Sequence, residues 1–121
     1  MDRPMTQNRV PHTVSGISSG AFMAVQHHVV WSNDVDGAGV IAGGPFWCAL
    51  ANAITAQTAC MKAPRLINLS ELLLITHTTH ITGFIDDPRN LVGDRVWLFS
   101  GTDDHEVVPG VVEKTRDYCM P

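Results

Sequence analysis

The pentapeptide Gly16-Ile17-Ser18-Ser19-Gly20 carries the clearest chemical signature in the sequence. It matches the G-x-S-x-G pattern of a nucleophile elbow, in which a serine on a sharp strand-to-helix turn keeps its hydroxyl exposed. The helix that follows directs free backbone N–H groups at developing negative charge. The pattern selects Ser18 as the nucleophile, because Ser19 has no glycine two positions away on either side. An ordinary Gly/Ser turn is the alternative interpretation.

A second group of candidates follows the apolar run 95–100. Asp103 and Asp104 lie in a loop that begins with Gly-Thr. In the Ser…Asp…His order, an acid placed after a later strand orients a histidine. Aspartates in surface loops are also common turn formers, and this alternative stays open. No histidine follows the acid at a distance, since the six histidines are His12, His27, His28, His77, His80 and His105.

Hydrophobic spacing predicts the elements that must position these groups. Short β-rich runs predict strands over residues 10–15, 38–42 and 95–100. Helical spacing predicts helices over 21–31 and 111–118, a short one within 48–60, and one over 69–81 with Asn68 or Ser70 as N-cap. The order β-α-β-α-α-β-α implies a three-layer α/β architecture, with a short parallel sheet of about three strands and helices on both sides.

Length and composition limit the domain count and the possible partners. A chain of 121 residues, 45% apolar and 17% charged, is expected to form one domain over 1–121, with residues 1–9 as a loose arm. The net charge of −4 and the lack of a basic stripe argue against a nucleic-acid partner. Glycines and a proline interrupt the nearly uncharged stretch 37–61, so no membrane span is expected. The first residues lack the apolar region of a signal peptide.

Several spaced motifs resemble those of the extracellular poly(3-hydroxybutyrate) depolymerases. They are the elbow segment 13–26, the strand with its aromatic-Cys-Ala loop at 37–49, the Cys60-Met61 pair, and the segments 85–91 and 94–102. The resemblance extends over nearly the whole chain from about Val10. It implies part of an α/β-hydrolase fold, with a Ser-Asp-His triad that cleaves polyester or related ester bonds and needs no cofactor.

The resemblance implies roles for particular residues. Ser18 would be the nucleophile, and the backbone N–H of Ser19 would supply one oxyanion donor. The family's Gly-Thr-x-Asp pattern, with Val three residues later, matches residues 101–107 and selects Asp104 over Asp103 as the acid.

The family also has a disulfide that Cys48 and Cys60 resemble. Such a bond would require an oxidising compartment, and two buried thiols are the alternative. Cys119 has no expected partner. Phe46 and Trp47 follow the second strand, where they either line a hydrophobic ester site or cap the core.

Structural roles are expected for two further tryptophans and two of the histidines. Trp31 and Trp97 are predicted to lie in the core. His77 and His80 are expected to be polar helix positions and not zinc ligands, because no further ligands converge on them by spacing. No metal site is predicted.

The family's histidine segment and its first strands have no counterpart in the matched motifs. We therefore expect the middle of a hydrolase domain, as a fragment, a truncated gene model or a degenerate paralogue. The expected function is a serine hydrolase of the polyester depolymerase or esterase type, acting through an acyl-enzyme and weakly active or inactive as given. The alternative is a non-catalytic binding module. The expected partners are an ester or polyester substrate and, through exposed sheet edges, further copies of the chain. The resemblance implies an extracellular or periplasmic location.

Overall fold

The structure is a computed structural model that describes residues 10–120, so the arm expected over 1–9 lies outside the described residues. Three strands alternate with helices. In chain order they are β1 (His12–Ile17), α1 (Ser19–Val30), β2 (Val35–Ile41), α2 (Ala53–Gln57), the 3₁₀ turn η1 (Pro64–Leu66), α3 (Leu69–Ile81), the 3₁₀ turn η2 (Pro88–Leu91), β3 (Arg95–Phe99) and α4 (Pro109–Cys119). The predicted order of strands and longer helices is confirmed.

The three strands form one parallel sheet in the order β1-β2-β3. The register joins Ile17 to Ile41 and Ile41 to Phe99, so all three strands end at the same level. The predicted short parallel sheet of three strands is therefore confirmed. The strand bounds differ slightly, because β1 continues into the elbow and β2 begins at Val35.

Helix starts follow local capping chemistry. The Asn68 side chain accepts a hydrogen bond from the Glu71 N–H at 3.2 Å, which selects Asn68 from the two predicted caps of α3. Asn52 caps α2 in the same way, through the N–H groups of Ile54 and Thr55. Both helices begin where the sequence provides a side-chain acceptor.

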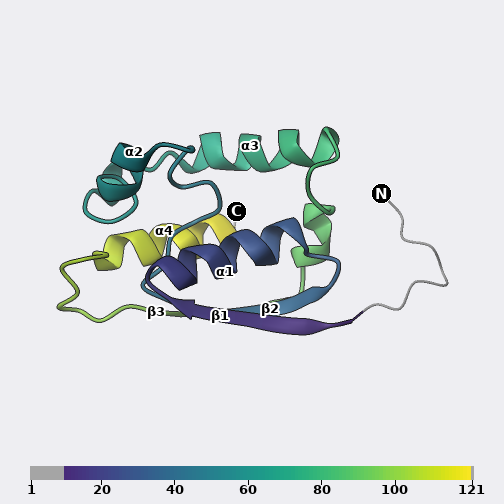
Figure 1. Ribbon diagram of the computed structural model, residues 1–121, viewed down its shortest axis with the longest axis horizontal. Helices are drawn as coiled ribbons and strands as arrows, with labels where there is room; N and C mark the ends of the chain where they lie inside the picture. Colours follow the sequence, from purple (N-terminus) through teal and green to yellow (C-terminus); the bar gives the residue numbers. More distant parts are fainter. Residues whose placement is uncertain (1–9, 121) are drawn as a thin grey trace.

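The layers differ from the expectation in one respect. In Figure 1, α1 and α4 lie on one side of the sheet, and α2 and α3 form a further layer beyond them. Within residues 10–120 the opposite face of the sheet carries no helix. The side chains of β3 accordingly alternate, with Val96 and Leu98 packed toward the core and Trp97 and Phe99 half exposed.

The core lies between the covered face of the sheet and the helices. Val40 of β2, Val25 of α1 and Val111 of α4 are buried there, together with Phe46 and Leu72. The prediction that Trp31 and Trp97 are core residues is wrong, since they are 49% and 59% exposed. Trp97 lies on the uncovered sheet face, where its ring stacks on Phe99 with centroids 5.8 Å apart. Among the described residues, no helix combines the length and apolar character that crossing a membrane requires.

Candidate active site

The carboxyl ends of the three strands meet at one edge of the sheet. The Ser18 N–H donates to the Ile41 carbonyl at 2.9 Å, and the Ala42 N–H donates to the Phe99 carbonyl at 2.9 Å. These bonds extend the sheet by one residue beyond β1 and β2. The segments that leave the strands therefore start side by side, which is where open α/β sheets bind ligands.

Ser18 occupies a strained turn between β1 and α1. Its φ and ψ are 55° and −120°, an unusual conformation for a residue with a side chain, and one that typically costs about 1–3 kcal/mol. Its carbonyl accepts from the Phe22 N–H at 3.0 Å and so joins α1. Its side chain does not cap the helix, and its hydroxyl has no hydrogen-bond partner among residues 10–120. Ser18 is exposed, and its hydroxyl is available to react.

The two glycines of the elbow have different roles. A Cβ on Gly16 would lie 2.2 Å from the Gly20 carbonyl oxygen and 2.7 Å from the Ala21 nitrogen. A Cβ on Gly20 would meet nothing within 4 Å. The close approach of strand and helix therefore requires glycine only at position 16.

The start of α1 supplies an electropositive environment beside Ser18. The first N–H groups of a helix, here from Ser19 onward, have no carbonyl partner within the helix. No acidic residue lies in the first turn of α1. The positive end of the helix dipole is thus left for an incoming negative charge.

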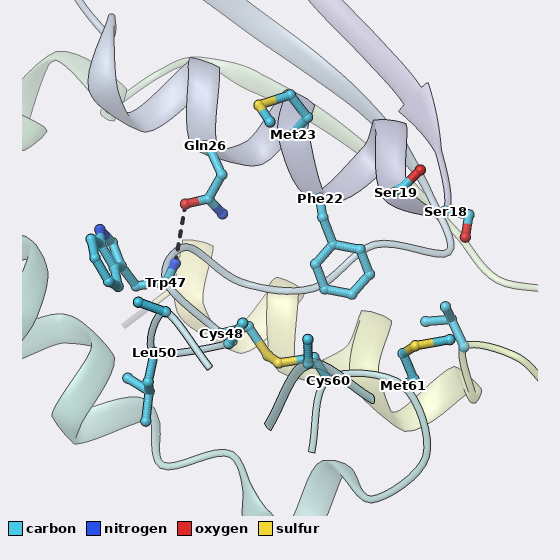
Figure 2. Close-up of a pocket in the computed structure, with 14 residues that line it drawn as sticks. Ser18, Ser19, Phe22, Met23, Gln26, Trp47, Cys48, Leu50, Cys60 and Met61 are labelled. Atoms are coloured by element: carbon cyan, nitrogen blue, oxygen red, sulfur yellow. Dashed lines mark hydrogen bonds between the residues drawn. A yellow bond between two sulfur atoms is a disulfide. The ribbon is translucent and has the colours of Figure 1, made fainter. Parts of the chain in front are cut away.

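A cavity of about 520 Å³ opens next to the elbow (Figure 2). One wall is α1, and the other walls are the loop after β2, the disulfide, and the segments at Met61 and Val107. No charged side chain lines it. Its lining consists of Ser18, Ser19, Phe22, Met23, Gln26, Trp47, Cys48, Ala49, Leu50, Ala51, Ala56, Cys60, Met61 and Val107. The cavity suits an uncharged ligand that reaches the serine hydroxyl.

The loop after β2 is held in an unusual conformation. Trp47, Leu50 and Ala51 all have φ between 51° and 59°. Cys48 and Cys60 form a disulfide with Cα atoms 5.9 Å apart, which confirms the expected pairing and anchors this loop to the segment after α2. A cross-link of this span contributes about 3 kcal/mol in the loop-entropy account. The disulfide therefore helps to fix the wall of the cavity.

The two aromatic candidates lie at different depths. Phe46 is 1% exposed and belongs to the core, whereas Trp47 is 38% exposed and lines the cavity. Their rings meet edge to face with centroids 6.4 Å apart. Only Trp47 is positioned to touch a ligand, with Phe46 supporting it from behind.

Asp104 lies in the loop after β3, at the same edge of the sheet as Ser18. Its Oδ1 accepts from the N–H groups of Glu106 at 3.0 Å and Val107 at 3.1 Å, so it shapes the turn that brings Val107 to the cavity. Its Oδ2 has no hydrogen-bond partner in the described part of the chain. Asp103 is exposed. The structure does not join the Asp104 carboxylate to Ser18 through a histidine, because no histidine of residues 10–120 lines the cavity.

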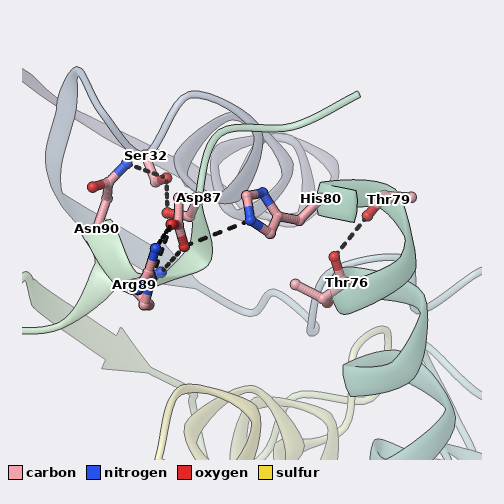
Figure 3. Close-up of polar contacts among 7 residues, drawn as sticks. All are labelled: Ser32, Thr76, Thr79, His80, Asp87, Arg89 and Asn90. Carbon is pink, nitrogen blue, oxygen red and sulfur yellow. Dashed lines mark hydrogen bonds and ion pairs between the residues drawn. The ribbon is translucent and has the colours of Figure 1, made fainter. Parts of the chain in front are cut away.

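Several histidines instead take part in contacts elsewhere. The buried His28 bonds to Asp94 with 2.8 Å between Nε2 and Oδ2, and His12 lies 3.2 Å from His27 between their Nε2 atoms. His80, at the end of α3, lies 3.9 Å from Asp87 (Figure 3). No group of three or more metal-ligating side chains occurs among the described residues.

Asp87 is the centre of the polar cluster in Figure 3. Its carboxylate accepts from the side chain of Arg89 at 2.6 and 2.9 Å and from the Arg89 backbone N–H at 2.9 Å. The side-chain bond and then the backbone bond lower the pKa of Asp87 from 3.8 to about 2. Its carbonyl accepts from the Ser32 hydroxyl at 3.1 Å, which ties η2 to the end of α1.

Sequence reasoning missed Gln26 as a site residue. Its Oε1 accepts from the backbone N–H of Trp47 at 3.3 Å, a bond that joins α1 to the loop that carries Cys48 (Figure 2). A signal was available in the spacing. Phe22 and Gln26 follow Ser18 at intervals of four residues, which places all three on one face of α1.

Comparisons with known proteins agree with this geometry. The chain is 49% identical over 107 residues to a poly(3-hydroxybutyrate) depolymerase of Delftia acidovorans, a match covering 88% of this chain and 22% of that protein. It is 30% identical over 109 residues to a polyhydroxybutyrate depolymerase of Talaromyces funiculosus, covering 86% and 30%. No protein-family profile matches the chain.

Two solved structures are similar in fold. The crystal structure of the PHB depolymerase from Penicillium funiculosum superposes with a TM-score of 0.76 at 28% identity, covering 93% of this chain and 34% of that one. A PHB depolymerase variant complexed with an R3HB trimer gives 0.74 at 28% identity, covering 93% and 35%. The chain thus spans between 22% and 35% of the length of these relatives.

Proposed function

This chain is poly(3-hydroxybutyrate) depolymerase-like in sequence and fold, and from that premise we propose that its serine cavity is the site of a polyester-type ester hydrolase. The observation that carries the proposal is the elbow itself. Ser18 has a strained backbone and an uncommitted hydroxyl, and it lies between a helix start and an uncharged cavity. A neutral ester is the substrate class that this combination of groups suits.

In the proposed reaction, the Ser18 Oγ attacks the carbonyl carbon of an ester. The backbone N–H of Ser19 donates to the oxyanion that forms, and the helix dipole stabilises the same charge. The hydroxyl proton would pass to a histidine base, the triad member that residues 10–120 do not supply at the cavity, and this base would return the proton to the departing alcohol oxygen as the C–O bond breaks. Water then hydrolyses the acyl-enzyme by the same route.

Asp104 is proposed as the acid that orients the base. Its place after β3 matches the chain order serine then acid, and its Oδ2 is available to accept from an imidazole N–H. The two bonds to Oδ1 would hold the carboxylate in position while it does so. Trp47 is the proposed aromatic contact with the substrate, and Phe46 is its support.

We further propose that this 121-residue chain is a weak catalyst. No histidine of residues 10–120 borders the cavity, so the base step lacks its group there. Serine proteases without one triad member retain about 10³–10⁴-fold catalysis over water from binding and the oxyanion hole. We expect this chain to hydrolyse activated short-chain esters barely above background and to leave polymer intact.

Hydrolysis of p-nitrophenyl butyrate tests the proposal. We expect a slow rate that disappears in Ser18→Ala and persists in the neighbouring control Ser19→Ala, because only the backbone of Ser19 takes part. Equal rates for the wild type and Ser18→Ala would contradict the proposal. Fast turnover that is lost in both Ser18→Ala and His105→Ala would overturn the weak-catalyst part.

A non-catalytic binding module is the second candidate function. The observation that favours it is the same cavity, which is open to an uncharged ligand whether or not Ser18 reacts. Binding of a neutral ester without any Ser18-dependent turnover would select this function.

The disulfide supports a proposed location in an oxidising compartment, outside the cell or in the periplasm. Thiol counting on protein isolated under non-reducing conditions tests it. We expect one reactive thiol, Cys119, and three would contradict the proposal.

Self-association through the edge strands β1 and β3 is a further proposal. Edge strands present free backbone groups to another chain, and the uncovered sheet face places Trp97 beside one edge. Sedimentation velocity tests it, and a mass independent of concentration at that of one chain would contradict it.

A further inference from the structure

Gln26 is the one polar side chain of the cavity lining that lies away from the elbow. It is on α1, eight residues beyond Ser18, and Phe22 lies between them on the same face of the helix. With the rise of an α-helix, Ser18 and Gln26 are about 12 Å apart along the axis. Between these two residues, the apolar side chains of Phe22 and Met23 line the cavity.

The orientation of the Gln26 amide is set by its partner. The backbone N–H of Trp47 can only donate, so the Gln26 atom that faces it at 3.3 Å must be the amide oxygen. The NH₂ group then points to the other side of the amide. Figure 2 shows this nitrogen on the side of Phe22, and it has no hydrogen-bond partner within residues 10–120.

The chemistry of this arrangement selects a class of ligand group. Because the amide oxygen is engaged by Trp47, Gln26 presents donors to the cavity. Each ester linkage along a polyester chain has a carbonyl oxygen that accepts and no group that donates. No cationic side chain lines the cavity, so a free carboxylate would enter it without a partner charge.

We propose that the Gln26 Nε2 donates a hydrogen bond to a carbonyl oxygen of a neutral ester chain, in a repeat beyond the ester that Ser18 attacks. The inference rests on the proposed function for the identity of the reacting ester. It makes Gln26 a residue that distinguishes chains of several ester units from a single short ester. A single unit bound at Ser18 does not extend the two helical turns to Gln26.

Two substitutions separate this role from a purely structural one. Gln26→Glu retains an oxygen that accepts from the Trp47 N–H and removes the donor. Gln26→Met removes both. Gln57→Glu is the matched control, because it makes the same change of charge on α2 outside the cavity.

Binding is measured in a Ser18→Ala background, so that the result is independent of turnover. Trp31→Phe and Trp97→Phe leave Trp47 as the only tryptophan, and its fluorescence reports on the cavity. The two probes are ethyl 3-hydroxybutyrate as a single unit and the methyl ester of the 3-hydroxybutyrate trimer.

We expect Gln26→Glu and Gln26→Met each to weaken trimer binding about 2- to 10-fold, the value of one neutral hydrogen bond. Binding of the single-unit ester should stay unchanged, and Gln57→Glu should match the parent protein with both probes. If Gln26→Glu binds the trimer as tightly as the parent does, the proposal is contradicted. Gln26 would then act only by holding the loop at Trp47. Equal weakening of both probes, an effect of Gln57→Glu, or no trimer binding by the parent would overturn it too. Labelling and turnover are measured separately, in protein that retains Ser18. A negative binding result for Gln26 is therefore distinguishable from failure of the proposed function.

Discussion

The two ends of the sheet use their polar groups and backbone in opposite ways. At the carboxyl end, Ser18 keeps an unpaired hydroxyl, and the non-glycine residues with positive φ in the described chain all lie there or in the loop that follows β2. At the amino end, His28 bonds to Asp94 and Asp87 bonds to Arg89. One end is strained and chemically available, whereas the other end has no non-glycine residue at positive φ within residues 10–120 and joins His28 to Asp94 and Asp87 to Arg89.

This difference suggests that one end of the sheet holds the candidate site and the other end stabilises the fold. Strained conformations persist only where the surrounding structure determines them. Here the strained edge is held by the Cys48–Cys60 disulfide, by buried Phe46 and by glycine at position 16. The opposite end contributes stability through side-chain pairs that do no chemistry at the candidate site. Substitutions at the amino end should therefore change stability without changing the reactivity of Ser18.

Gly16→Ala should have the largest effect on stability. A Cβ at this position meets backbone atoms at 2.2 Å, and backbone cannot rotate away as a side chain would. We expect a loss of about 3 kcal/mol in the free energy of unfolding, the upper end of the range for overpacking. Urea unfolding measures it. Gly20→Ala is the control and should change stability by no more than about 1 kcal/mol, since its Cβ enters open space. Equal effects of the two substitutions would contradict the assigned geometry of the elbow.

Asp94→Ala should destabilise the opposite end by about 1–3 kcal/mol, because it leaves the buried His28 imidazole without its partner. The reactivity of Ser18 should not change, since the pair lies away from the cavity. Urea unfolding combined with the rate of modification of Ser18 tests both parts. A folded Asp94→Ala protein with altered Ser18 reactivity would break the separation between the two ends.

Asp87 should make a smaller contribution that depends on pH. The bonds from Arg89 lower its pKa in the folded chain from 3.8 to about 2. The contribution of this carboxylate to stability is therefore complete above about pH 4 and is lost as the pH falls through 2. Asp87→Asn should flatten the acid limb of a plot of thermal midpoint against pH. The exposed Asp103→Asn is the control and should retain the parent's slope. An unchanged slope in Asp87→Asn would contradict this assignment.

The sequence predicts the elements that have strong local signals. The elbow, the parallel order and the start of α3 at Asn68 follow from short-range patterns, and all are present. The disulfide was available only from the family resemblance, because spacing alone does not pair cysteines.

The uncovered face of the sheet could not be predicted from residues 95–100. An uninterrupted apolar run such as Val96-Trp97-Leu98-Phe99 is typical of a strand buried on both sides, and its sequence has no polar alternation. The structure nevertheless leaves Trp97 and Phe99 half exposed. What covers a face depends on tertiary packing, which a local pattern does not encode.

The conformation of the cavity wall could not be predicted from the sequence either. Trp47, Leu50 and Ala51 are poor choices for positive φ by residue type, so no local signal indicates the turns that direct them. Their conformation comes from anchors on either side, the buried Phe46 and the disulfide. The spacing of four residues places Gln26 on the same face of α1 as Ser18 and Phe22, but it does not indicate the partner of Gln26, a backbone N–H on a loop 21 residues away.

Covalent labelling with a fluorophosphonate tests the central claim, that the strained edge of the sheet carries a reactive serine. Peptide mapping by mass spectrometry should find one adduct, on Ser18, which is lost in Ser18→Ala and kept in Ser19→Ala. The reaction should be slow, in line with a cavity that no described histidine borders. An unmodified Ser18, or adducts distributed equally over other serines of the chain, would contradict the account.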